Sequence, residues 1–228
     1  MEGYHVELDL LRHLFMHDPG TTAMTGLRFV HFIGLAIGLG GATMLDLMLL
    51  RFFVRQRIAS ETLSIFEFSS RIVGCGLWIL WFTGLGFLTI YALDDASKLT
   101  NPKVHAKLVI VLLLTMNGLF IHRRILPVLK DRVGQCLFTG MAPRQRVVLT
   151  VSGSISAVSW YVPVALGAFS QLNDLVPASA ILAIYATLLV STTAAMYIFM
   201  RLASPRTCRQ SRARTAMAAR LSSRADRA

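Results

Sequence analysis

Charged side chains are scarce in this sequence, and acidic ones are scarcer than basic ones. Only 15% of the 228 residues are charged, whereas 54% are hydrophobic, and lysine plus arginine outnumber aspartate plus glutamate by 23 to 12. A soluble domain of this size is rarely so apolar. The composition therefore argues against a soluble globular protein and favours one that is embedded in a membrane.

Cysteine is also sparse, and the common catalytic motifs are missing. Cys75, Cys136 and Cys208 form no disulfide framework, and we expect free thiols, because the last two are predicted to face a reducing cytoplasm. There is no phosphate-binding glycine loop, nucleophile elbow or zinc-protease helix in the sequence. A CxxCH motif is absent too, so any haem would be held noncovalently.

Long apolar stretches are what the sequence does contain. A membrane-spanning helix needs about 20 mostly apolar residues to cross a hydrocarbon layer of about 30 Å. The predicted spans are residues 26–50, 72–92, 104–122, 147–170 and 177–200. We therefore predict an all-α fold, a polytopic membrane bundle of five transmembrane helices over residues 26–201.

Two further segments flank this predicted bundle. Residues 1–25 are expected to be an exported leader with a short interfacial amphipathic helix. The leader lacks the basic region of a signal peptide, so we expect the first span to insert as a membrane helix. Residues 202–228 form a basic tail that is expected to be disordered or loosely helical and drawn to anionic lipids.

Basic residues alternate from loop to loop and predict the orientation. They gather after the first and third spans and in the tail, whereas the leader and the other two loops are acidic or nearly neutral. The positive-inside rule then places the N-terminus outside and the C-terminus in the cytoplasm. The net charge of +11 is thus explained by topology and not by a nucleic-acid partner. The short loops suit a bacterial inner membrane.

The histidines supply the main functional hypothesis. Five of the six lie on the predicted outer side, and His31 and His105 fall at the outer ends of two spans that run in the same direction. The two could differ in depth by about one helical turn. His31 also shares a face with Gly34 and Gly38, which would let another helix or a flat ligand approach closely.

Two neutral imidazoles beside a glycine wall suit axial ligation of a b-type haem. Lys107, two residues after His105, would pair with a haem propionate or a substrate carboxylate, or else extend to the interface. The alternative is structural: His105 is then an interfacial residue, and His31 is a hydrogen-bonded contact between helices.

A second hypothesis is a metal site without haem. His13 and His17 are four residues apart, so a helix would place both on one side, with Met16 and Met24 close by in sequence. Imidazole and thioether ligands together suit copper.

Polar residues inside other spans are also expected to have partners. Ser152, Ser156 and Ser159 form a stripe that should face the interior of the bundle. Asp46 pairs most simply with Arg51 or with the arginines of the third loop.

Two stretches resemble a known group of membrane proteins. Val30-His31-Phe32-Ile33-Gly34, continuing to Gly40-Gly41, is similar to the first-helix pattern of the CopD-like and HemJ-like proteins. His105-Ala106-Lys107-Leu108 is similar to their third-helix signature. The resemblance covers about the first 125 residues. It implies that His31 is a haem ligand and Lys107 a functional lysine. HemJ-type members are haem-b-binding protoporphyrinogen oxidases, and CopD-type members are linked to copper handling.

The chain also departs from that group. Thr43-Met44-Leu45-Asp46 stands where HemJ-like proteins have an aromatic and Pro-Arg segment, and their later methionine ligand has no clear counterpart. We therefore carry over the fold and a haem, but not the oxidase reaction.

The leading prediction is a membrane redox protein that binds haem b through His31, with His105 as second ligand, and transfers electrons as a possible oxidoreductase. It would work with a redox partner or as a homo-oligomer. The alternatives are a copper or other metal-ion binding or transport protein, and a non-catalytic membrane subunit.

Overall fold

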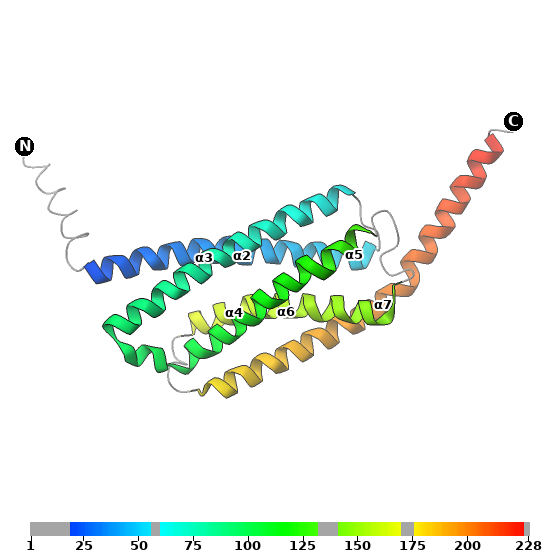
Figure 1. Cartoon of the computed structure of the whole chain (residues 1–228). Coiled ribbons are helices and arrows are strands. Elements are labelled where there is room, and N and C mark those ends of the chain that lie inside the picture. The colour runs from blue at the N-terminus through cyan, green and yellow to red at the C-terminus, as the bar shows by residue number, and fades with distance from the viewer. Residues whose placement is uncertain (1–18, 56–59, 132–140, 170–175, 226–228) are drawn as a thin grey trace, which may run out of the picture.

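The computed structural model describes residues 19–55, 60–131, 141–169 and 176–225, and this part of the chain is helical apart from short connections (Figure 1). The elements in chain order are α2 (Pro19–Arg55), α3 (Ser60–Asp94), the 3₁₀ helix η1 (Ala96–Thr100), α4 (Pro102–Phe120), the π-helix η2 (Ile121–Ile125), α5 (Leu126–Lys130), α6 (Pro143–Ala168) and α7 (Ala178–Ala225).

Five candidate membrane spans lie in the described residues: Gly20–Arg51, Leu63–Asp94, Pro102–Lys130, Pro143–Ala168 and Ala178–Leu202. Each is long and apolar enough to cross a bilayer. The prediction of an all-α, multi-pass membrane protein with five spans is therefore confirmed.

The helices extend beyond the predicted spans. Backbone hydrogen bonding continues past the hydrocarbon layer, so a helix need not end where charged residues begin. The third span continues through η2 into α5, and α7 continues as helix into the basic tail as far as Ala225. The predicted leader helix lies outside the described residues.

The two ends of the bundle differ in charge, and we name them by this difference. The η1 end carries the short helix that connects α3 to α4. The opposite, basic end carries exposed arginines at Arg51, Arg123, Arg124, Arg144 and Arg201. The alternation expected from the sequence is thus present in three dimensions, although the leaflet that each end faces stays a prediction.

The helices form two packed groups. α3 lies along α2, whereas α4 packs on α6 and α7, and α2 joins the groups through contacts with α6 and α7. Three hydrophobic clusters fill the interior: one at the basic end around Leu129, one between α4, α6 and α7 around Ile110, and one at the centre around Trp160.

A glycine contact explains why α2 and α3 lie so close together. A Cβ atom placed on Gly76 of α3 would lie 2.5 Å from the backbone nitrogen of Gly38 and 2.9 Å from the carbonyl oxygen of Gly34. Any side chain at Gly76 would therefore push the two helices apart. Small residues at membrane helix interfaces allow this approach of two backbones.

Local sequence accounts for the ends of α4. The Asn101 side chain accepts a hydrogen bond from the Lys103 backbone at 2.9 Å, and Pro102 occupies the first turn, where its missing N–H costs nothing. At the other end Pro127 cannot donate to the preceding turn. The helix widens just before it into the π turn of η2, where the Leu126 N–H bonds the Ile121 carbonyl.

Candidate functional site

His31 points from α2 onto α3. Its Nδ1 atom lies 2.7 Å from the hydroxyl oxygen of Thr83, a residue that is almost fully buried. The ring is half-buried and meets Phe87 edge-on, with the two centroids 5.4 Å apart. The imidazole is therefore held by one polar and one aromatic contact, both from the same neighbouring helix.

The Thr83 contact bears on which His31 nitrogen carries the proton. The Thr83 hydroxyl lies 2.7 Å from the Ile79 carbonyl oxygen, and when it donates there, its oxygen accepts from His31. In this arrangement Nδ1 carries the hydrogen, and Nε2 carries the lone pair. A metal-binding histidine is commonly oriented in this way, with the second nitrogen donating to a nearby acceptor.

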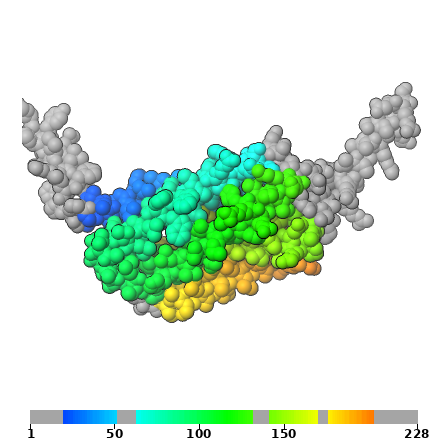
Figure 2. All heavy atoms as spheres, viewed as in Figure 1, coloured from blue at the N-terminus to red at the C-terminus, as the bar shows by residue number. Residues whose placement is uncertain are grey.

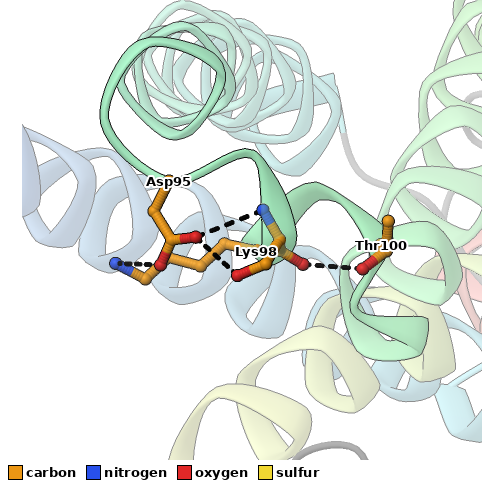
Figure 3. Close-up of polar contacts among 4 residues, drawn as sticks. Asp95, Lys98 and Thr100 are labelled. Atoms are coloured by element: carbon orange, nitrogen blue, oxygen red, sulfur yellow. Dashed lines mark hydrogen bonds and ion pairs between the residues drawn. The ribbon is translucent and has the colours of Figure 1, made fainter.

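An aromatic column connects His31 with the η1 end. Phe87 stacks on Tyr91 with the centroids 6.4 Å apart, and the ammonium of Lys98 lies 5.7 Å from the centre of the Tyr91 ring. Lys98 in turn pairs with Asp95 at 3.3 Å (Figure 3). The column thus runs from an intramembrane imidazole to a charged surface turn.

Asp95 is the anchor of that turn. Its carboxylate accepts hydrogen bonds from the hydroxyl and the backbone N–H of Ser97. The Ser97 hydrogen bond is the main reason why the pKa of Asp95 lies below its ordinary value, and Lys98 lowers the pKa further. The carboxylate is therefore charged at neutral pH and caps η1.

Two lysines of α4 lie in the η1 half of the bundle. Lys107 is half-buried, close enough to His31 for an electrostatic interaction, and its ammonium reaches the side of Gly167 in α6. Lys103 is almost fully buried and donates to the carbonyl of Phe169, the C-cap of α6. A cation at a helix C-terminus is favoured by the helix dipole. Lys103 thus has a structural role, whereas Lys107 lies near the candidate site.

His105 does not join this cluster. It is exposed on α4, and in the described part of the chain no hydrogen bond or ring contact links it to His31. Thr83, which marks the level of His31, lies eleven residues before the end of α3, or about 16 Å. His105 lies three residues after the start of α4, or about 5 Å. His31 is therefore about 12 Å deeper, more than the expected single turn.

The glycine face of α2 is occupied by protein. Gly34 faces Ile79 and Gly76 of α3, and a Cβ on Gly38 would overlap the Trp160 ring of α6 at 2.4 Å. Of the two expected uses of this face, the close approach of another helix is the one observed. The flat surface beside His31 is supplied instead by the ring of Phe87.

Polar groups deeper in the bundle satisfy one another. The Asn117 side chain donates to the Ser152 carbonyl at 2.9 Å and accepts from the Ser152 hydroxyl at 2.7 Å, and Ser159 bonds the Tyr185 hydroxyl at 2.8 Å. The interior position predicted for Ser152 and Ser159 is confirmed. Asp46 is half-buried, and among the described residues it forms no ion pair with Arg51.

The copper hypothesis rests on residues whose structure is not described. His13, His17 and Met16 all lie outside the described residues. Within those residues no group of three or more His, Cys, Asp or Glu side chains is placed to hold a metal ion. Cys75 is exposed and not in a disulfide, as expected.

The sequence predicted His31 and Lys107 as site residues, but it did not predict the two residues that contact His31. Thr83 is 52 residues from His31 and sits in a span with no polar stripe. Phe87 could not be told from any other apolar residue of that span. A threonine inside an apolar helix is the one signal that could have drawn attention to this position.

No protein-family model, curated protein or solved structure matches this chain. The resemblance to the CopD-like and HemJ-like proteins thus stays a prediction that rests on the short motifs around His31 and His105.

Proposed function

We propose that this multi-pass membrane protein binds haem b through Nε2 of His31 and acts in electron transfer in a bacterial inner membrane. One observation carries the proposal, namely the hydrogen bond between Nδ1 of His31 and Thr83; with Nδ1 as the donor, Nε2 is able to ligate iron. When bound, the haem supplies one-electron redox chemistry.

The neighbouring residues fit such a group in four respects. Thr83 holds the imidazole at one angle, so little orientational freedom is lost on ligation. Phe87 offers an apolar ring beside His31. Lys107 brings a positive charge to the same region, where it would pair with a propionate. Phe87 and Tyr91 would shield the site from water on the side of the η1 end.

The proposal uses His31 alone among the histidines. His105 lies nearer the end of the bundle, so a second axial ligand from this residue is not part of the proposal. The copper alternative keeps His13 and His17 as its ligands, and no observation in the described residues favours it.

Absorption spectroscopy of the purified protein tests the proposal. After haem supplementation we expect a Soret band that shifts on reduction. His31→Ala should abolish the band, and Lys107→Met should weaken haem binding without removing it. His105→Ala and His122→Ala are matched controls, because both residues are exposed histidines of the α4–η2 segment. A wild-type protein that binds no haem under these conditions would overturn the proposal.

A further inference from the structure

α3 runs beside α4 and its continuation α5 across one face of the molecule, and two polar contacts join α3 to this segment (Figure 2). The Trp81 indole donates to the Thr115 hydroxyl at 3.0 Å near the middle of the bundle. Towards the basic end, Lys130 pairs with Glu67 at 2.8 Å. Their backbones are otherwise not closely packed, since the main neighbour of α3 is α2.

Between these two contacts each helix carries a glycine that faces open space. Gly74 lies seven residues, or two turns, before Trp81 and so on the same face of α3. Gly118 lies one turn beyond Thr115 on α4. A Cβ atom at either glycine would have nothing within 4 Å. We call this space, bounded by Trp81–Thr115 and Glu67–Lys130, the α3–α4 recess.

Arginines flank the mouth of the recess. Arg71 lies about 15 Å from Trp81 along α3, and Arg123 of η2 lies about 12 Å from Thr115 along the continuous α4–η2 helix, so the two are at similar depth. Around its helix axis, Arg71 lies about a quarter turn from Trp81, and Arg123 lies about a quarter turn from Thr115. Because the two helices are antiparallel, both arginines lie on the same, outward side. Both are exposed, and neither has an ion pair or hydrogen bond with the residues that the structure describes.

The depth of these arginines matches a lipid headgroup. Arg123 lies 21 residues after Pro102, where the third span begins, which is about 31 Å along the helix. That length equals the hydrocarbon thickness of a bilayer, so Arg123 sits at its boundary. On the membrane side of Arg123 the surface is apolar, with Trp78, Met116 and Leu119 all more than half exposed.

We propose that the α3–α4 recess binds an acyl chain of an anionic phospholipid whose phosphate is held by Arg71 and Arg123. Arginine recognises phosphate oxygens through paired hydrogen bonds. The nearby carboxylate of Glu67 is already paired with Lys130, so little remains to attract the ammonium of a zwitterionic headgroup. The site is separate from His31 and does not depend on haem.

Native mass spectrometry of the full chain in detergent, titrated with phosphatidylglycerol or phosphatidylcholine, tests the proposal. The wild type should bind phosphatidylglycerol more tightly. The double variant Arg71→Gln, Arg123→Gln should lower this affinity roughly tenfold to thirtyfold, to the level of phosphatidylcholine. Arg144→Gln is the matched control, because Arg144 is exposed at the basic end but lies on α6. Its affinity should be unchanged.

Gly118→Leu tests the recess itself. The added Cβ atom enters open space and leucine favours the helix over glycine, so the melting temperature should not fall. Binding of both lipids should nevertheless weaken, because the leucine takes the place of the acyl chain. Equal affinities for the two lipids in the wild type, or an equal loss in Arg144→Gln, would overturn the proposal. Retention of lipid by Gly118→Leu would do so too.

Discussion

The half-buried hydrogen bond between His31 and Thr83 fixes the orientation of the imidazole and favours the tautomer with the proton on Nδ1. The Thr83 hydroxyl can accept from Nδ1 while it donates to its own helix. The chemistry of the site therefore depends on a residue that would itself contact no cofactor.

Thr83→Val tests this dependence. The change keeps the shape of the side chain but leaves the His31 N–H without its acceptor, which should cost about 1–3 kcal/mol of unfolding free energy. Thermal unfolding in detergent measures the loss. Thr89→Val is the control, since Thr89 is exposed and bonds only its own helix, and it should change stability by less than about 0.5 kcal/mol. Similar losses in both variants would contradict the prediction.

The surface turn at Asp95 should respond to acid. Because the folded protein lowers the pKa of Asp95, the turn is stabilised at neutral pH. This stabilisation is lost as the pH falls through the folded pKa, since the protonated group no longer accepts from Ser97 as a carboxylate. We expect the amide protection factors in η1, that is, exchange rates corrected for their intrinsic pH dependence, to fall below the ordinary aspartate range. In Asp95→Asn the protection factors should be equally low at neutral and acid pH, and a persistent pH response in that variant would count against this explanation.

At the scale of the elements, the contact between α2 and α3 depends on Gly76. In Gly76→Ala the new Cβ would collide with backbone atoms of Gly38 and Gly34, which cannot move without separating the helices. We expect a loss of about 1–3 kcal/mol, measured as a lower melting temperature.

Gly40→Ala provides the comparison for Gly76→Ala. Gly40 is exposed on α2, and a Cβ there meets nothing within 4 Å. Alanine favours a helix over glycine by roughly 0.5–1 kcal/mol, so this variant should be as stable as the wild type or slightly more stable. If both substitutions destabilise the protein alike, the cause is not the contact between α2 and α3.

The sequence was sufficient to predict the helices because membrane insertion depends on local hydropathy. The hydropathy of each stretch follows from its own residues, without knowledge of its neighbours in space. Pairing of the helices is different. The face around Gly34 and Gly38 predicts the close approach of another helix. The residues that pack against this face, Gly76 and Trp160, are distant in sequence. Nothing in their spacing tells which helix will meet the glycines. For the same reason Thr83 could not be assigned to His31 from the sequence.

For the whole molecule, the charge difference between the two ends is the strongest remaining constraint on topology. Most exposed arginines of the described residues lie at the end of the bundle opposite η1, and Arg28, near the start of α2, is an exception. The positive-inside rule predicts from this difference that the basic end faces the cytoplasm.

Reporter fusions in a bacterial host test this orientation. A fluorescent protein attached after residue 228 should be fluorescent, because it would fold in the cytoplasm. Alkaline phosphatase at the same position should be inactive, whereas phosphatase inserted at η1 should be active. The reverse pattern would show that the chain is inserted the other way.

The separate packing of α2 with α3 has a consequence for biogenesis. These two helices are consecutive in the chain, and each is the main packing partner of the other. The glycines of their contact belong to α2 and α3 alone, so the contact requires no later segment. The pair can therefore associate in the bilayer as soon as it has left the ribosome, while α4, α6 and α7 are still being synthesised. Assembly would then begin with this hairpin, and Trp160 would attach the later helices to it.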